Sequence, residues 1–272
     1  MLIVQLTDTH VVEPGHLQYG RFDTNARLAT AVDHINAMDP VPDVAIITGD
    51  LVENGHPAEY VLCAELLSGL SMPHYVVAGN HDIVAGIATA FGYIEELPGP
   101  DVASLDYVVD RHEVRLVALD TSIPGEHGGN LSSGQLEWFD ETLAARADAP
   151  TLVMMHHPPF ISGIDWMDRS RLENSASLEE VVARHAQIGA VVCGHLHRPI
   201  QAAFGGTVAM TSSSTSMQIA LALGETHPYS MTNEDPAVTL HDWPTGGRLV
   251  THRSVIKDGL ENYRAEWSLD LG

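Results

Sequence analysis

The sequence predicts an α/β fold, because strand-length apolar stretches alternate with amphipathic helical patterns through the first two hundred residues. A second observation supports this fold class: a short polar cluster follows each of five of these stretches, as expected where strands end at one edge of a sheet. The five stretches are Leu2 to Leu6, Val44 to Ile47, His74 to Ala78, Leu152 to Met155 and Ala190 to Val192. Strand ends that deliver polar groups to one edge form a cup suited to metal binding or catalysis.

Helical patterns fill most of the segments between these stretches. Asp23 and Thr24 can cap the first helix, and His56-Pro57 opens the next one with proline near its first position. Ser132 and Gln135 form a capping box for a later helix. Further elements are expected as a weak helix within 83–100, strands around 104–109 and 114–119, and a helix over 178–187.

The pattern changes after Pro199 to short β-like segments. Gly205-Gly206 and Thr245-Gly246-Gly247 are typical of hairpin turns, while 211–235 is polar and irregular. We expect one domain over residues 1–272. Within it, 1–200 forms the metal-site core, and 201–272 completes a sheet and supplies a substrate rim or a dimer arm.

The net charge limits the possible partners. The 272 residues carry 36 acidic and 13 basic side chains, which gives −23. Such a surface repels nucleic acid polymers, whose binding needs Lys and Arg at the phosphates, and no basic stripe offsets it. A small anionic substrate could still enter if metal ions reverse the sign locally. The composition therefore favours small phosphate esters over polynucleotides.

The sequence also predicts a cytoplasmic protein without a membrane partner. No apolar run approaches the roughly 20 residues of a membrane span, and the first strand leads into Asp8 without a basic segment or cleavage site. The two cysteines, Cys63 and Cys193, are expected to be buried apolar residues rather than a disulfide.

The polar clusters contain carboxylate, amide and imidazole groups but no thiolate. They are Asp8-Thr9-His10, Gly49-Asp50, Gly79-Asn80-His81-Asp82, His156-His157 and Gly194-His195-Leu196-His197. In Asp-x-His and His-x-His the two outer residues share a side of the strand. These ligand types suit Mn, Fe, Co or Zn in a catalytic site rather than a structural zinc site. Asp82 is expected to cap the helix that follows it.

In this order the clusters resemble the calcineurin-like metallophosphoesterase superfamily, over residues 2 to about 200. Tyr19-Gly20 with Asp23 and Arg27, and His156-His157-Pro158-Pro159, resemble one bacterial branch of it. That branch contains class III cyclic-nucleotide phosphodiesterases and glycerophosphodiester phosphodiesterases. The resemblance implies a four-layer αββα sandwich with the metals at the strand ends.

The resemblance also implies two divalent metal ions, with Mn²⁺ or Fe²⁺ expected and Zn²⁺ or Co²⁺ as alternatives. The implied ligands are Asp8, His10 and His197 for the first ion and Asn80, His156 and His195 for the second, with Asp50 as the bridge. A metal-bound hydroxide between or beside such ions would attack phosphorus in line.

Other residues receive roles in substrate binding and proton transfer. The resemblance makes His81 a phosphate contact and the acid for the leaving alkoxide, with Asn80 as a further contact. We expect Glu53 to orient His81. Phosphoprotein phosphatases continue Asp-Arg-Gly where this chain has Glu53-Asn54-Gly55. The missing arginine favours diesters over monoesters.

The expected function is hydrolysis of 3′,5′- or 2′,3′-cyclic nucleotides or glycerophosphodiesters. The resemblance also implies a homo-oligomer, a dimer or higher. A phosphomonoesterase or pyrophosphatase is the alternative, and it needs an arginine clamp. Its candidates are Arg27, Arg169, Arg171 and Arg198, of which Arg198 directly follows His197 and is our candidate substrate contact. A non-catalytic scaffold is disfavoured because every ligand type is in place. The segments 161–174 and 211–235 could form the walls of the substrate pocket, and the sequence does not decide whether they do.

Overall fold

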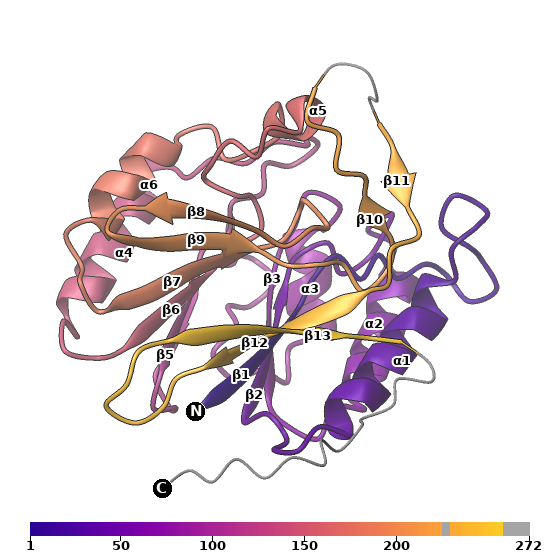
Figure 1. Ribbon diagram of the computed structural model, residues 1–272, viewed down its shortest axis with the longest axis horizontal. Helices are drawn as coiled ribbons and strands as arrows, with labels where there is room; N and C mark the ends of the chain where they lie inside the picture. Colours follow the sequence, from indigo (N-terminus) through magenta and orange to yellow (C-terminus); the bar gives the residue numbers. More distant parts are fainter. Residues whose placement is uncertain (225–228, 258–272) are drawn as a thin grey trace, which may run out of the picture.

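The computed structural model describes residues 1–224 and 229–257 and shows two β-sheets packed between two layers of helices (Figure 1). Helices α1, α2 and α3 cover the outer face of the first sheet, and α4 and α6 cover that of the second. The predicted α/β class and the four-layer αββα arrangement are therefore confirmed.

The first sheet has five strands in the order β13-β12-β1-β2-β3. Its central strands β1, β2 and β3 are parallel, whereas β12 runs antiparallel to both β1 and β13. The bounds are β1 Leu2–Leu6, β2 Val44–Thr48, β3 His74–Val77, β12 Ala237–Asp242 and β13 Val250–Val255. The C-terminal strands thus extend the sheet that the first strand begins.

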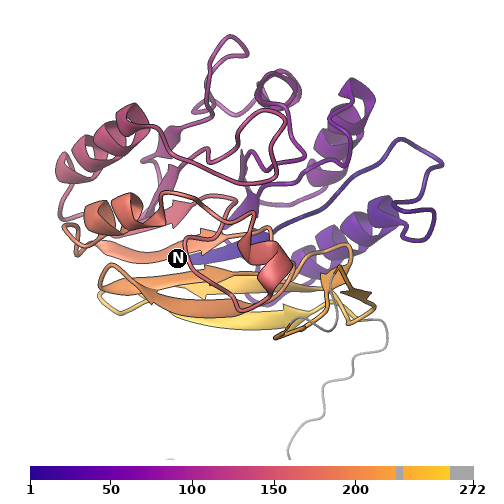
Figure 2. The ribbon, with the colours of Figure 1, turned by 90° about the horizontal axis from the view of Figure 1, so that it is seen from above.

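The second sheet has six strands in the order β4-β5-β6-β7-β9-β8, with β5, β6, β7 and β9 parallel. The bounds are β4 Tyr107–Val109, β5 Arg115–Ala118, β6 Thr151–Met154, β7 Ile188–Cys193, β8 Ile200–Phe204 and β9 Thr207–Thr211. A separate short hairpin consists of β10 Gln218–Ile219 and β11 Met231–Thr232. Figure 2 shows β12 and β13 beside β8 and β9, where the Ser212 and Thr239 hydroxyls lie 2.6 Å apart.

The helices begin largely where their caps predict. Asp23 accepts from the Ala26 amide at 3.0 Å, and the capping box of Ser132 and Gln135 is formed. The helix predicted over 178–187 is shifted, because residues 183–187 are needed as a turn into β7. The helices are α1 Thr24–Asn36, α2 Pro57–Leu67, α3 Val84–Ala90, α4 Ser133–Ala144, α5 Asp165–Asp168 and α6 Ser175–Val182.

Alternating side chains of the parallel strands fill two cores. In β5, Leu116 and Ala118 pack with residues of the first sheet, whereas Val117 faces the core under α4 and α6. Both faces of these strands are buried, which explains their continuous apolar sequences. One buried polar residue in these strands is Gln5, whose amide nitrogen donates to Thr48 Oγ1 and to the Cys193 carbonyl, both at 2.9 Å. Among the described residues, no helix is both long and apolar enough to cross a membrane.

Candidate metal centre

The predicted ligands converge where the parallel strands of both sheets end. β1, β2 and β3 bring Asp8, His10, Asp50 and Asn80 from one sheet, while β6 and β7 bring His156, His195 and His197 from the other. Ligand sites in open α/β sheets lie at these carboxyl ends. The side chains of all seven except Asn80 are almost fully buried.

The backbone is strained at most of these positions. Asp8, His10, Asp50, His195 and His197 all have positive φ angles, between 45° and 69°. Non-glycine residues adopt this conformation at a cost of roughly 1–3 kcal/mol, and such residues concentrate at functional sites. The strand ends therefore turn sharply enough to aim adjacent ligand types into one space.

Two groups of donor atoms surround Asp50. One ligand atom each from Asp8, His10, Asp50 and His197 lie within 4.8 Å of one another. On the other side, Asn80 Oδ1 lies 3.2 Å from His156 Nε2 and 3.0 Å from His195 Nδ1. Asp50 Oδ2 is 3.4 Å from His156 Nε2 and 3.7 Å from His10 Nε2, which places it between the groups.

Three of the imidazoles are fixed from behind by oxygen acceptors. Nδ1 of His10 lies 2.8 Å from Glu53 Oε2, that of His156 lies 2.8 Å from the Thr48 carbonyl, and that of His197 lies 2.8 Å from the Met217 carbonyl. Because carbonyls and carboxylates only accept, each Nδ1 carries a proton, and Nε2 is the nitrogen that can present a lone pair to the cluster when the ring is neutral.

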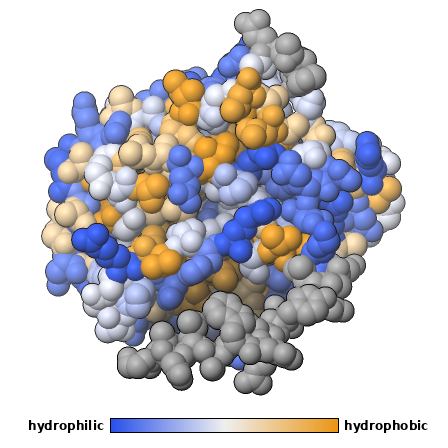
Figure 3. All heavy atoms as spheres, viewed as in Figure 1, coloured by the Kyte–Doolittle hydropathy of each residue, from blue (hydrophilic) through white to orange (hydrophobic). Residues whose placement is uncertain are grey.

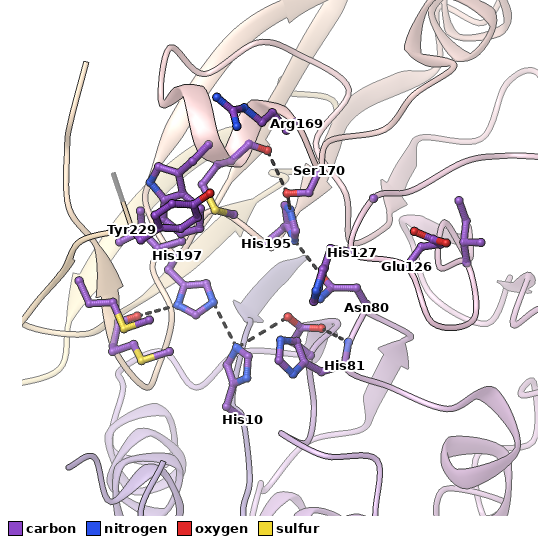
Figure 4. Close-up of a pocket in the computed structure, with 18 of the residues that line it drawn as sticks. His10, Asn80, His81, Glu126, His127, Arg169, Ser170, His195, His197 and Tyr229 are labelled. Carbon is purple, nitrogen blue, oxygen red and sulfur yellow. Dashed lines mark hydrogen bonds and ion pairs between the residues drawn. The ribbon is translucent and has the colours of Figure 1, made fainter. Parts of the chain in front are cut away.

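These lone pairs face other acceptors. Nε2 of His10 lies 3.2 Å from Nε2 of His197 (Figure 4). Nε2 of His156 faces the oxygens of Asn80 and Asp50. Opposed acceptors repel one another unless a proton or a cation lies between them. A histidine backed by a carboxylate or carbonyl is typical of metal sites. The residues present thus fit divalent ions with nitrogen and oxygen ligands.

The pKa values of Asp50 and His195 agree with this chemistry, whereas the carboxylates of Asp50 and Asp8 outweigh burial and raise the pKa of His156 to about 9 and that of His197 above 6.5. Burial opposes ionisation of Asp50, but the nearby His156 and His81 outweigh it and hold its pKa well below 3.8. Burial, together with His157 and His156, lowers the pKa of His195 well below 6.5. An ionised bridging carboxylate and a neutral imidazole are the forms that coordinate metal.

Glu53 contacts two histidines through different groups. Its carboxylate accepts from His10 at 2.8 Å and from Gln18 Nε2 at 2.6 Å. His81 Nδ1 instead donates to the backbone carbonyl of Glu53 at 2.7 Å and lies 3.9 Å from the carboxylate. Asp50 Oδ1 accepts from the His81 amide at 2.9 Å. The ring of His81 is therefore held by the Glu53 carbonyl, and its backbone amide is held by the Asp50 carboxylate.

The expectation that Asp82 caps the following helix is wrong. Helix α3 begins after Ile83 without a side-chain cap. The Asp82 carboxylate instead accepts from the amides of Gly79 and Leu51 at 2.9 and 3.1 Å. Burial, and then the charge of Asp50, raise its pKa to about 7. Buried amides in the two ligand loops need an acceptor, and Asp82 supplies it.

The ring of His157 packs beside those of His156 and His195, with its centroid 4.9 Å from each, but its nitrogens bond to other groups. Its Nδ1 lies 2.7 Å from Thr121 Oγ1 and its Nε2 lies 3.2 Å from the His127 carbonyl, so both nitrogens are engaged. Gly129 packs against this ring so closely that a Cβ would overlap it. Burial lowers the pKa of His157 to about 3, which keeps the ring neutral.

The donors open into a cavity of about 630 Å³, a size typical of small-molecule sites (Figure 4). The segment 161–174 borders it through Trp166, Arg169, Ser170 and neighbouring residues. Ser170 Oγ lies 3.0 Å from His195 Nε2 and so orients that ring.

The four candidate arginines differ in position, and only Arg169 lines the cavity. Arg198 donates to the Ile219 carbonyl at 2.6 Å and pairs with Glu234 at 3.0 Å. Arg27 donates to the Ser216 carbonyl, and Arg171 donates to the Asp168 carbonyl at 2.9 Å.

Sequence reasoning missed several residues at this cavity, including Tyr19, Met217 and Tyr229. Tyr229 belongs to no motif, Tyr19 enters only as part of the branch resemblance, and the Met217 contribution is a backbone carbonyl. The usable signals were coarse: Trp166 stands in 161–174, and Met217 and Tyr229 stand in 211–235, the two segments named as possible pocket walls.

Comparison with known proteins agrees with this geometry. The model of the calcineurin-like phosphoesterase family matches residues 1–199. A probable glycerophosphodiester phosphodiesterase of Arcobacter nitrofigilis is 34% identical over 94% of this chain and 93% of its own. A probable cyclic nucleotide phosphodiesterase of Rhodopseudomonas palustris is 34% identical over 95% and 94%. A dimetal phosphatase from Danio rerio shares the fold with a TM-score of 0.62 at 14% identity, over 89% and 92%. The chain belongs to the calcineurin-like phosphoesterase family of hydrolases.

Proposed function

We propose that this protein hydrolyses small phosphodiesters at a centre of two divalent metal ions. The observation that carries this proposal is the set of facing nitrogen and oxygen atoms around Asp50, which divalent cations between them would satisfy. Glycerophosphodiesters and cyclic nucleotides are the candidate substrates, because similar chains bear those names.

In this proposal the ligands form two sets that share Asp50. The first set is Asp8, His10 and His197, and the second is Asn80, His156 and His195. When bound, two divalent cations at such a site neutralise phosphate oxygens and lower the pKa of water, which becomes the nucleophile.

Two residues of the chain would act directly on the substrate. His81 lines the cavity with its Nδ1 fixed by the Glu53 carbonyl, so its Nε2 can hold a proton for the leaving alkoxide oxygen. Asn80 directs Oδ1 to the two histidines, which leaves its Nδ2 group to donate to a phosphate oxygen. Glu53 would act through His10 and, by its carbonyl, through His81.

A phosphomonoesterase remains the second candidate, because Arg169 lines the cavity and could bind a doubly charged phosphate. Arg198 is the weaker candidate for a substrate contact, since Ile219 and Glu234 already accept from its guanidinium. A cytoplasmic location, a homodimer, and Mn²⁺ or Fe²⁺ as native metals belong to the same proposal.

The test is hydrolysis of bis(p-nitrophenyl) phosphate and p-nitrophenyl phosphate by metal-stripped protein reloaded with Mn²⁺. We expect faster turnover of the diester and no turnover without metal. A preference for the monoester that disappears in Arg169→Ala would replace the diesterase by the phosphatase. Metal analysis of protein purified without added metal, and light scattering, test the metals and the dimer.

A further inference from the structure

Two aromatic side chains form an open wall of the cavity beside the candidate metal centre. Trp166 comes from α5, and Tyr229 comes from the segment before β11. Their ring centroids lie 5.2 Å apart with the planes tilted by 43°. Tyr229 is 69% exposed although it is packed against another ring. Two segments far apart in the chain thus present aromatic surface to one space.

The backbone supports a functional reading of Tyr229. Its φ angle is 60°, in the left-handed region that a bulky residue adopts only at a cost. Within the described part of the chain, the other non-glycine residues with positive φ are Tyr19 and five candidate ligands. Tyr19 also lines the cavity. Among the described residues, every non-glycine residue with the same strained backbone conformation as Tyr229 is therefore a candidate ligand or lines the cavity.

Apolar side chains extend the wall. Met217 and Met231 line the same cavity, and their flexible, polarisable thioethers suit contact with a flat ring. Figure 3 shows apolar side chains gathered on the molecular surface near α5. Aromatic and apolar groups exposed together mark a ligand-binding groove or an interface, and these line the cavity beside the candidate metal centre.

The charges around the wall favour an uncharged ligand group over a cationic one. Arg169 lies on the same side of the cavity as Tyr229, whereas Glu126 lies across it, with His195 and Asn80 between (Figure 4). Glu173, the other cavity carboxylate outside the candidate centre, is joined to Gly129 on the chain that leads to Glu126, its amide donating to the Gly129 carbonyl at 2.8 Å. An arginine beside the rings repels an ammonium group but tolerates a neutral aromatic ring.

We propose that Trp166 and Tyr229 bind the nucleobase of a nucleoside-bearing phosphodiester and so favour such diesters over glycerol diesters. This inference rests on the proposed diesterase function. Bases stack on aromatic side chains without regard to sequence, because every base has a π-face. The wall thus determines specificity, whereas the reacting phosphate lies with the metals.

The experiment compares Trp166→Ala and Tyr229→Ala with the wild type on cyclic AMP and on the aliphatic diester glycerophosphoglycerol. Ile161→Ala and Leu221→Ala are matched controls, because both residues are exposed, stand in the same two segments and do not line the cavity. We expect each wall variant to lower kcat/KM for cyclic AMP about tenfold or more, through KM, and to leave glycerophosphoglycerol within about twofold. Trp166→Phe and Tyr229→Phe should restore most of the loss.

Binding of 5′-AMP and glycerol 3-phosphate by calorimetry, without turnover, separates the wall from the chemistry. Loss of 5′-AMP affinity in Trp166→Ala, with glycerol 3-phosphate unchanged, supports the wall even if no diester is hydrolysed. Equal losses for both substrates, or no loss for cyclic AMP in an active diesterase, overturn it. A selective loss for glycerophosphocholine instead would overturn it in favour of a quaternary ammonium.

Discussion

The carboxylate of Glu53 lies 2.8 Å from Nδ1 of His10 and reaches no closer than 3.9 Å to Nδ1 of His81. The same residue fixes His81 by its backbone carbonyl at 2.7 Å. A side-chain substitution can therefore remove the first contact and keep the second. This separates the support of a candidate metal ligand from the support of a candidate acid.

Glu53→Gln should weaken metal binding by about 10–100-fold, the usual effect of losing a group that orients a ligating histidine. The amide accepts less strongly from His10 and is isosteric. A competition titration with a chromogenic chelator measures the affinity. Glu13→Gln is the control, since Glu13 pairs with the exposed His56 away from the cluster. Unchanged metal affinity with lost activity would instead assign the carboxylate to His81.

His81→Gln should slow hydrolysis most where the leaving group needs a proton. We expect a loss of about 10²–10⁴ in kcat for an alkyl diester and a much smaller loss for bis(p-nitrophenyl) phosphate, because nitrophenolate leaves as an anion. The ratio of the two rates is the measurement. An equal loss for both substrates would mean that His81 only contacts the phosphate.

The ligand types and their place at strand ends could be predicted, because each cluster is adjacent in sequence to the strand that positions it. The acceptors behind the imidazoles could not. The carbonyls of Thr48 and Met217 have no sequence signal, since every residue has one, and only the fold selects them. The contacts of Asp82 could not be predicted for a similar reason: its partner amides at Leu51 and Gly79 come together only when two loops meet.

The wall residues Trp166 and Tyr229 show a second limit on what the sequence can predict about the site. Trp166 and Tyr229 belong to segments that the sequence marks only as irregular, and their contact depends on how both loops cross the end of the sandwich. Aromatic residues in loops are common, so neither residue alone predicts a binding role. The positive φ of Tyr229, which carries that argument, is a property of the folded backbone.

Metal binding should stabilise the fold, because the ligands come from both sheets. At a concentration of about 100 times Kd, a bound ion adds about 2.7 kcal/mol to the free energy of unfolding. For a chain of this size the expected rise in Tm is about 5–10 °C. Asp50→Asn should abolish most of this rise, whereas Asp33→Asn, at an exposed site on α1, should keep it. Calorimetry with and without Mn²⁺ measures both, and a full rise in Asp50→Asn would exclude Asp50 as the bridge.

The buried His241 should make the fold sensitive to acid. Its Nε2 donates to Gln5 Oε1 at 3.0 Å, and burial lowers its pKa from 6.5 to about 4. Above pH 6.5 the ring is neutral in both states, so its contribution to stability is complete. Between pH 6.5 and 4 only the unfolded chain takes up the proton, so this group lowers the free energy of unfolding as pH falls, by about 1.4 kcal/mol per pH unit.

His241→Gln keeps a donor for Gln5 and removes this titration. The slope of unfolding free energy against pH should therefore be shallower in the variant by about 1.4 kcal/mol per unit between pH 6.5 and 4. His252→Gln is the matched control, because His252 is exposed on the neighbouring strand β13 and pairs in register with Leu240. Urea unfolding at half-unit pH steps gives the slopes. Parallel slopes for wild type and His241→Gln would show that the ring takes up its proton in the folded state as readily as in the unfolded one.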